Sequence, residues 1–322
     1  MRISVIVLTL NSEKYIRRCL DALDAQTFRE FEVLIVDAGS TDATLAVVDT
    51  YSGQLAIRVC AAVGTNMGQA RNVGIRAAAG AYLCFCDSDD YYLPAKLSTQ
   101  IGFLEANPEY GACYYDAYHF QSACPDRRYL RPSTRKSGAL LKEFLKVQTI
   151  NINTLMIRRQ PSAADILFPD DDAGKYGEDW QYLISLGLAG TSFGFVPGSY
   201  SVIEERVDSH TSWNIQHLMK WYVLRHLLAN EAGIAARGIP RMSLWSCYAL
   251  QYAKFIAACS VSGHADFAYK TPFTEGRAWE PVFMLFYRLA CLVALERGYF
   301  RRLLRWLWLS KRQYRSRPVS VI

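Results

Sequence analysis

The chain has 322 residues, of which 51% are hydrophobic and 20% are charged. This composition supplies a sizeable core and excludes intrinsic disorder and collagen-like folds. At roughly 100–200 residues per domain, the length predicts one large domain or two ordinary ones. The nine cysteines are odd in number and include no CxxC pair, which excludes a zinc ribbon and a secreted disulfide framework and predicts a reducing compartment.

The net charge of +6 is concentrated near the C-terminus. From Glu280 onward nine Lys and Arg residues accompany two Glu residues, a balance of +7, whereas the remainder has 27 basic and 28 acidic residues, a balance of −1. This asymmetry predicts an anionic partner for the basic tail, residues 280–322. No uncharged apolar run reaches the ~18 residues of a spanning helix, and the first residues lack signal-peptide features, so we expect a cytoplasmic protein.

Strands and helices alternate through the first hundred residues. Runs of β-branched and apolar residues predict buried strands, and apolar residues at helical spacing predict the helices between them. The predicted strands cover residues 3–9, 31–37, 57–60 and 82–86, and the predicted helices cover residues 12–26, with Ser12 as the cap, 41–51 and 67–79. Short loops between them favour right-handed βαβ units, so we expect an α/β fold with a mostly parallel central sheet and flanking helices.

The pattern is less regular after residue 90. It predicts helices over residues 97–106, 137–147 and 179–189, and strands over residues 112–120 and 153–157. From about residue 213 only helical spacing is visible. We therefore expect an α/β domain over residues 1–212, with a nucleotide-binding half (1–100) and an acceptor and catalytic half (101–212). A C-terminal helical region is expected over residues 213–322.

Polar residues follow each of the first four predicted strands, and the carboxyl ends of parallel strands meet at one edge, where ligands bind. The most informative segment is Asp87-Ser88-Asp89-Asp90, which comes directly after a hydrophobic strand. Adjacent carboxylates repel each other unless a cation neutralises them, and oxygen ligands suit Mg²⁺ or Mn²⁺. The alternative interpretation is a solvated acidic turn that caps the helix beginning near Pro94.

Two further motifs place charge at helix starts. In the segment from Asn66 to Asn72, Arg71 offers a permanently charged group suited to phosphate, or it is one exposed arginine of an ordinary helix start. Glu178 and Asp179 open a later helix, where a carboxylate either caps the first turn or acts as a general base. No G-x-G-x-x-G follows the first strand and no Walker loop is present, which disfavours a dinucleotide-binding fold and a phosphate-binding P-loop.

Five motifs occur in a fixed order between residues 3 and 189: VIVLTLNSEKYI, EVLIVDAGSTDAT, NMGQARNVGI, GAYLCFCDSDDYYLP and GEDWQYLISLGLAG. Together they resemble glycosyltransferase family 2. The resemblance implies the GT-A fold and a metal-dependent enzyme that transfers a sugar from a nucleotide diphosphate with inversion. It also implies a role in bacterial surface polysaccharide or lipopolysaccharide assembly. Little of the helical C-terminal third is covered.

The resemblance also implies which residues hold the nucleotide. Thr9, Asn11 and Asp37 would line the base and ribose pocket, and Arg71 would lie near the base and the diphosphate. Asp87 would hold ribose or sugar hydroxyls.

Asp89 would be the principal ligand of Mn²⁺ or Mg²⁺, by the same resemblance. Asp179, with Glu178 beside it, would be the catalytic base that deprotonates the acceptor hydroxyl. His210 lies in a polar segment, residues 200–212, that family members often close over the nucleotide. It would be a further metal or diphosphate ligand, or alternatively a surface residue.

The sequence departs from the family pattern in the region of the base pocket. Leu8 and Leu10 stand where proline and tyrosine are common, and Ala38 replaces a second acidic residue. Because that carboxylate often recognises the base, the resemblance implies a nucleotide diphosphate more firmly than UDP, although a UDP-sugar remains the first expectation for the donor. The expected acceptor is a glycan or a lipid-linked sugar.

Residues 299–314 (YFRRLLRWLWLSKRQY) separate into an apolar face and a basic face when placed at ~100° per residue. This pattern predicts a helix that docks on an anionic membrane surface, at the inner face of the cell membrane, or one that packs on its own domain. A protein of another class, a non-catalytic one that uses the tail to bind nucleic acid or membrane, is disfavoured. No RNA-binding signature accompanies the tail, and the acidic turn is intact.

Overall fold

The computed structural model describes residues 1–159, 166–170, 175–206 and 216–240, and residues 243, 247 and 251. Of these, Met1–Arg206 form one compact unit, and the described residues that follow belong to a second unit, which contains α8 (Gln216–Ala229) and α9 (Glu231–Ala236). The predicted domain boundaries stay predictions. Within the described part of the chain, no helix is long and apolar enough to cross a membrane.

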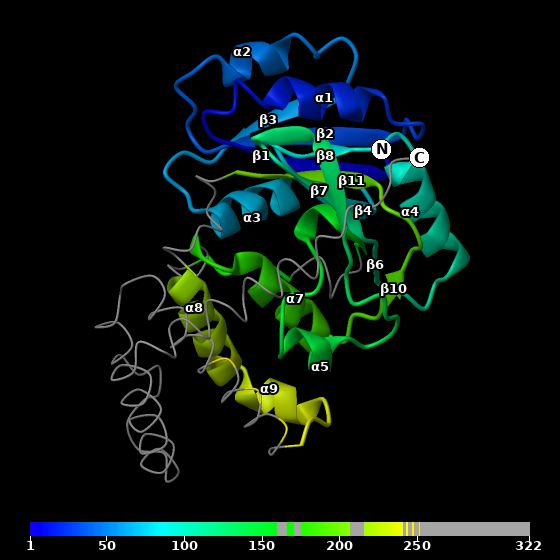
Figure 1. The fold of residues 1–322 in the computed structure, drawn as a ribbon, viewed down its shortest axis with the longest axis vertical. Helices are drawn as coiled ribbons and strands as arrows, with labels where there is room; N and C mark the ends of the chain where they lie inside the picture. Colours follow the sequence, from blue (N-terminus) through cyan, green and yellow to red (C-terminus); the bar gives the residue numbers. More distant parts are fainter. Residues whose placement is uncertain are drawn as a thin grey trace. The chain divides into compact units, whose positions relative to one another are not determined.

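The first unit is built on a seven-stranded sheet with the strand order β10-β6-β9-β4-β1-β2-β3 (Figure 1). Strand β9 runs antiparallel to both of its neighbours, β4 and β6, and the other strand pairs are parallel. The predicted mostly parallel sheet is therefore confirmed. The strands are β1 (Ile3–Thr9), β2 (Phe31–Asp37), β3 (Ile57–Ala61), β4 (Tyr82–Asp87), β6 (Ala112–Tyr114), β9 (Met156–Arg158) and β10 (Phe193–Phe195).

Helices cover both faces of this sheet. In Figure 1, α1 and α2 lie on one side of β1 and β2, and α3 and α7 lie on the other. Among the described residues, the helices of this unit are α1 (Ile16–Asp24), α2 (Thr44–Asp49), α3 (Met67–Ala77), α4 (Lys96–Ala106), α5 (Leu141–Phe144) and α7 (Glu178–Leu188), with a 3-10 turn η1 (Ile152–Thr154).

The start of α1 differs from the prediction. Tyr15, not Ser12, is the N-cap, and it makes no side-chain capping bond. The Ser12 hydroxyl lies instead 2.8 Å from the hydroxyl of Ser88, on the loop after β4. Ser12 thus joins two strand ends at the edge of the sheet, which is a tertiary contact that local capping rules do not anticipate.

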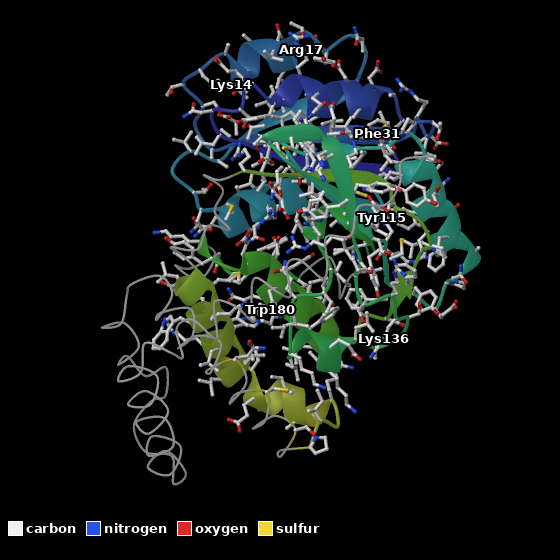
Figure 2. The ribbon with its side chains drawn as sticks, viewed as in Figure 1. Lys14, Arg17, Phe31, Tyr115, Lys136 and Trp180 are labelled. Carbon is white, nitrogen blue, oxygen red and sulfur yellow. The ribbon has the colours of Figure 1, made fainter. Side chains whose placement is uncertain are left out.

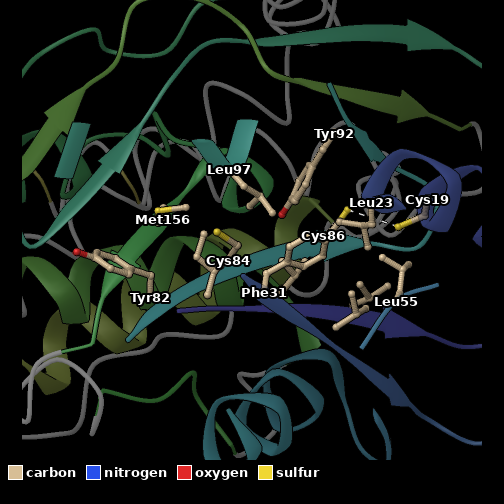
Figure 3. Close-up of a cluster of buried hydrophobic side chains, with 14 of the residues drawn as sticks. Cys19, Leu23, Phe31, Leu55, Tyr82, Cys84, Cys86, Tyr92, Leu97 and Met156 are labelled. Atoms are coloured by element: carbon tan, nitrogen blue, oxygen red, sulfur yellow. Dashed lines mark hydrogen bonds between the residues drawn. The ribbon is translucent and has the colours of Figure 1, made fainter. Parts of the chain in front are cut away.

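Four buried thiols lie in the core between the sheet and the helices α1 and α4. Cys19 on α1 and Cys86 on β4 face each other in Figure 3, with their sulfur atoms 3.7 Å apart. Cys84 and Cys113 belong to the same cluster. Every cysteine among the described residues is a free thiol, so the core uses them as small apolar side chains.

A second sheet has the strand order β5-β11-β7-β8. The predicted single strand over residues 112–120 is in fact two strands, because the chain leaves the first sheet at Tyr115-Asp116 and enters the second. The predicted helix over residues 137–147 is shortened to α5, since Gly138 pairs with Phe193 and extends the first sheet. The strands of the second sheet are β5 (Tyr91–Tyr92), β7 (Ala117–Gln121), β8 (Cys124–Arg131) and β11 (Ser201–Glu205).

Candidate active site

Residues 87–90, here called the acidic turn, lie at the carboxyl end of β4, as the sequence predicts. Asp87 is held by Asn153 of η1: the Asp87 backbone N–H donates to Asn153 Oδ1 at 3.1 Å, and Asn153 Nδ2 donates to Asp87 Oδ2 at 3.2 Å. The same Nδ2 donates to the carboxylate of Asp90. Asn153 thus links two carboxylates of the turn, and nothing in its local sequence indicated that role.

Asp90 has a structural role in the acidic turn. Its side chain is buried, and Oδ1 accepts the backbone N–H of Glu204 at 2.8 Å. Burial and the neighbouring charge of Asp89 raise the pKa of Asp90 well above its usual value. Asp90 therefore attaches strand β11 to the turn rather than pointing at a ligand.

Asp89 is exposed enough to meet a ligand, with 22% of its side chain accessible. Burial, followed by the charge of Asp87, raises the pKa of Asp89 to about 6. Arg206 Nη1 lies 3.5 Å from Asp89 Oδ2, and Arg18 donates a hydrogen bond to the Asp89 backbone carbonyl. A carboxylate in this environment is stabilised by an additional positive charge.

Arg71 is a buried cation shared by three carboxylates. Its side chain is 2% exposed, and its terminal nitrogens lie 2.6 Å from Glu178 Oε1, 2.9 Å from Asp179 Oδ1 and 3.1 Å from Asp87 Oδ1. Burial alone would lower the pKa of Arg71, but the surrounding carboxylates raise it. Three negative charges against one positive charge leave this cluster with an excess of negative charge.

Glu178 and Asp179 are the first two residues of α7, directly after Gly177, which has a φ of 68°. Trp180, labelled in Figure 2, is fully buried and donates its indole N–H to the Phe144 carbonyl at 2.5 Å, which fixes the start of α7 against α5. Burial raises the pKa of Asp179, and the Arg71 charge lowers it less than burial and the neighbouring carboxylates raise it. A carboxylate with a raised pKa is suited to accept a proton near neutral pH.

Arg71 is supported by residues that the sequence interpretation did not single out. The ring of Phe168 lies 5.3 Å from its guanidinium and stacks on Tyr182, with ring centroids 3.9 Å apart. Asn72 holds the backbone of Phe168 by two hydrogen bonds, of 2.9 Å to its carbonyl and 2.8 Å from its N–H. These contacts join segments about 96 residues apart in the chain, so no local pattern reveals them.

The residues predicted for the base and ribose pocket lie together at the carboxyl ends of β1 and β2. Asp37 accepts hydrogen bonds from Thr9 Oγ1 at 3.0 Å and from the backbone N–H groups of Gly39 and Ser40 at 3.1 and 2.9 Å. Burial would raise the pKa of Asp37, but these bonds and one from the Ser40 hydroxyl lower it. Asp37 is therefore a charged group that shapes the loop after β2.

Asn11 is exposed on the neighbouring loop with a φ of 49°, and its Oδ1 accepts the Thr41 N–H at 2.9 Å. Leu10, after β1, and Val63, after β3, are exposed apolar side chains at the same edge of the sheet. The edge thus carries apolar groups beside the polar groups of Thr9 and Asp37, the combination that ligand sites use.

Strand register connects the two halves of the site. Thr9 of β1 pairs with Asp37 of β2, and Leu8 pairs with Asp87 of β4. The structure thus brings the predicted nucleotide-binding residues beside the acidic turn, Arg71 and the start of α7. His210 and the basic tail lie outside the described residues, so their predicted roles stay predictions.

A divalent cation fits the acidic turn through its charge. Within the described ranges, no group of three or more His, Cys, Asp and Glu side chains forms a complete metal site. An ion at Asp89 would therefore rely on oxygens from a ligand, as Mg²⁺ does when it binds through one or two carboxylates and substrate phosphates. The raised pKa of Asp89 and the excess of carboxylates around Arg71 are consistent with an ion held in this way.

Comparison with known proteins gives one family match, Glycosyl transferase family 2, over residues 4–167. An uncharacterized protein of Mycobacterium tuberculosis is 32% identical over 219 residues, which cover 66% of this chain and 60% of that protein. TarS of Staphylococcus aureus, a poly(ribitol-phosphate) β-N-acetylglucosaminyltransferase, is 43% identical over 110 residues, 33% of this chain and 19% of TarS.

WfaP of Escherichia coli, a UDP-Glc:α-D-GlcNAc-diphosphoundecaprenol β-1,3-glucosyltransferase, is 26% identical over 200 residues, covering 62% of this chain and 77% of WfaP. The chain therefore spans only 60% of the length of its mycobacterial relative and a fifth of TarS.

Solved structures share the fold. Residues 1–349 of S. aureus TarS in complex with UDP-GlcNAc align with a TM-score of 0.61 and 22% identity, covering 89% of this chain and 79% of that one. The mannosyltransferase PcManGT of Pyrobaculum calidifontis, in complex with GDP-Man and Mn²⁺, aligns with a TM-score of 0.58 and 18% identity, covering 94% and 83%. The predicted GT-A fold is confirmed.

Proposed function

Because the chain belongs to glycosyl transferase family 2, we propose that it transfers a sugar from a nucleotide-diphosphate donor to a hydroxyl group of a glycan or a lipid-linked acceptor. The observation that carries the proposal is the cluster of Asp87, Glu178 and Asp179 around Arg71, beside Asp89. It combines a carboxylate suited to proton transfer with carboxylates suited to a cation. A UDP-sugar is the first choice of donor, because WfaP uses UDP-Glc and the TarS structure holds UDP-GlcNAc.

Asp179 is the general base of the proposed reaction. It accepts the proton of the acceptor hydroxyl while that oxygen forms a bond to the anomeric carbon of the sugar. The bond between this carbon and the diphosphate oxygen breaks on the opposite face, so the configuration inverts and no covalent enzyme intermediate forms. Arg71 and Glu178 hold Asp179 in place, since both lie against it at the start of α7.

Asp89 is the proposed ligand of Mn²⁺ or Mg²⁺, with His210 as a second ligand. When bound, the ion would neutralise the negative charge that develops on the leaving diphosphate. Support comes from the environment of Asp89, where burial and Asp87 raise the pKa of the carboxyl. The Mn²⁺ in the PcManGT complex is a further indication.

The nucleotide is proposed to bind at the ends of β1 and β2, where Thr9, Asn11 and Asp37 surround the base and ribose. Asp87 binds ribose or sugar hydroxyls, and Arg71 acts near the diphosphate by holding Asp87. The donor half of the site is therefore continuous along the edge of the sheet, from β2 to β4.

We propose a setting in surface polysaccharide or lipopolysaccharide assembly on the cytoplasmic side of the cell membrane. The buried free thiols suit a reducing compartment, and the named acceptor of WfaP is lipid-linked. The basic tail is proposed to dock on the anionic membrane surface, and no nucleic acid is involved. Cosedimentation with anionic vesicles that survives deletion of residues 297–322 would contradict the tail assignment.

Two substitutions test the roles of the base and the metal ligand. In Asp179→Asn the proton acceptor is lost, so the rate of sugar transfer is expected to fall about 10²–10⁴-fold, while donor affinity stays within about twofold. Asp89→Ala is expected to abolish transfer and also the Mn²⁺ dependence of nucleotide binding. Transfer assays and calorimetric titrations with UDP-sugars, with and without Mn²⁺, measure both. Transfer at the wild-type rate by Asp179→Asn would show that the base is another residue.

A further inference from the structure

The loop between β8 and α5 is attached to the same edge of the sheet as the acidic turn. Cys113 of β6 and Cys84 of β4 both pair with Met156 of β9. The chain leaves this sheet at Tyr115, whose hydroxyl lies 3.5 Å from the carbonyl oxygen of Asn153, the residue that holds Asp87. Asp116 is the next residue, and β6, which it follows, lies on the side of β4 opposite to β1 and β2.

Asp116 is almost fully buried, with 5% of its side chain exposed, and it organises this loop. One carboxylate oxygen accepts the backbone N–H and the hydroxyl of Ser133 at 2.7 and 2.8 Å. The other accepts Nε of Arg135 at 2.7 Å and lies 2.6 Å from its Nη2. The hydroxyl of Tyr114 donates to the carbonyl of Lys136, labelled in Figure 2, and accepts its N–H. Asp116 therefore fixes the side chain of Arg135, and Tyr114 fixes the backbone of the residue that follows it.

The backbone of Arg135 has a conformation that is uncommon for residues other than glycine. Its φ of 54° is in the left-handed region, where glycine is favoured, and glycine does occupy the next such position, Gly138. Strained residues of this kind persist where the surrounding structure fixes them, often at binding sites. The side chain is 51% exposed, and within the described residues its Nη1 has no hydrogen-bond or ion-pair partner.

We propose that Arg135, oriented by Asp116, binds a phosphate group of the acceptor. A planar guanidinium whose other side is held by a carboxylate presents a fixed pair of N–H donors, the geometry that recognises phosphate. The acceptor is accordingly a phosphate-bearing molecule, either a polyol-phosphate chain or a sugar linked to a lipid through diphosphate. This inference rests on the proposed glycosyltransferase function and adds the chemical class of the acceptor. In the contrary interpretation, Arg135 only neutralises Asp116.

The test measures acceptor binding separately from donor binding. Binding of UDP and GDP with Mn²⁺ is measured first on the full chain, and the tighter nucleotide is then kept saturating so that phosphate does not enter the donor site. Two fluorescent probes follow: a soluble oligomer of polyol phosphate, and a polyprenyl-diphosphate sugar in phosphatidylcholine vesicles. The probe that binds identifies the source of the phosphate.

Arg135→Gln is expected to weaken the probe that binds about tenfold. Arg135→Lys, which keeps the charge and loses the fork, is expected to weaken it about threefold. The matched control is Arg127→Gln: Arg127 is exposed on β8 and, within the described residues, makes no ion pair, so the affinity for the probe should change less than twofold.

Equal probe affinity of the wild type and both Arg135 variants would overturn the inference. So would failure of both probes to bind the wild type while a nucleotide binds. If Arg135→Gln does not fold, which loss of nucleotide binding reveals, the Arg135→Lys comparison decides alone, because lysine still pairs with Asp116. If the wild type binds neither nucleotide, it is the proposed function that fails.

Discussion

Arg71 forms ion pairs with three carboxylates, and this unequal ratio determines how substitutions in the cluster should behave. Removing one carboxylate charge reduces the excess of negative charge, whereas removing the guanidinium leaves three buried or half-buried carboxylates without their cation. Removing the partner of a buried charge is strongly destabilising, because the remaining charge is left uncompensated.

We therefore expect two substitutions in the cluster to lower the free energy of unfolding by very different amounts. Arg71→Gln should lower the free energy of unfolding by about 3–5 kcal/mol. Asp87→Asn should lower it less, by about 1–2 kcal/mol, because two carboxylates still pair with Arg71 and only one of the two donors that Asp87 accepts from, Arg71 and Asn153, then meets the amide NH₂. Urea unfolding at pH 7 measures both. If Asp87→Asn lowered the free energy of unfolding more than Arg71→Gln did, the cluster would not carry an excess of negative charge.

At the level of single residues, the sequence predicts site residues best where a charged side chain stands beside a predicted strand or helix start. Asp87, Asp89, Arg71 and Asp179 carry charge beside predicted strands and helix starts, and the structure does bring them together. Asn153, Asn72 and Phe168 were not identified, because an asparagine or a phenylalanine has no sequence context that marks it as a support. Their roles come from partners 66 to 96 residues away.

Among the elements, α3 is placed by a close approach to the sheet. Gly74 lies where a Cβ atom would be 2.5 Å from Ile6 Cγ2 and 3.1 Å from Val36 Cγ2. The helix therefore packs directly on β1 and β2, and this distance positions Arg71, one turn earlier, beside Asp87. Gly102 of α4 provides a contrast, because a Cβ there would meet no atom within 4 Å.

This contrast gives a paired prediction for the two glycines. Gly74→Ala should destabilise the protein by about 1–3 kcal/mol, since Ile6 and Val36 must move. Gly102→Ala should stabilise it by up to about 1 kcal/mol through helix propensity alone. Both free energies come from urea unfolding curves. If Gly74→Ala proves as stabilising as Gly102→Ala, α3 does not pack closely against Ile6 and Val36.

Elements with a strong hydrophobic period were predicted well, and those of the second sheet were not. The strands β1 and β2 have the predicted ends, because each is a mostly apolar run of seven residues that is buried on both faces. Strand β8 (CPDRRYLR) is mostly exposed and has no apolar alternation, so its pairing with β7 comes from the tertiary structure. Strand β11 was interpreted as part of a polar closing segment, because it is only five residues long and two of them are glutamates.

The stability of the whole molecule at acid pH depends in part on Glu205, at the end of β11. Burial would raise the pKa of this carboxyl, but hydrogen bonds from His119 and Tyr129 and the charge of Arg131 lower it to about 2, from an ordinary value of 4.5. A lowered pKa means that the stabilisation is fully present above pH 4.5 and is lost as the pH falls from 4.5 toward 2.

Glu205→Gln should therefore be less stable than the wild type at pH 7, by up to about 3 kcal/mol at 1.36 kcal/mol per pH unit. The difference between the two proteins should decrease steadily between pH 4.5 and 2. Denaturant midpoints at pH 7, 4 and 2.5 report this convergence. A difference that does not depend on pH would assign the effect of the substitution to packing and not to charge.

The hydrogen bond from the Glu204 N–H to Asp90 spans 114 residues of sequence, and it has a consequence for the order in which the protein matures. A ribosome that adds 5–20 residues per second needs roughly 6–23 s to synthesise the 114 residues between the two partners. During that interval the nascent chain holds Asp90, Asp89 (the proposed metal ligand) and the loops proposed to bind the nucleotide, but lacks the strand β11 that Asp90 attaches to the turn. The proposed active site should therefore be completed late in translation, when most of the first sheet is already in place.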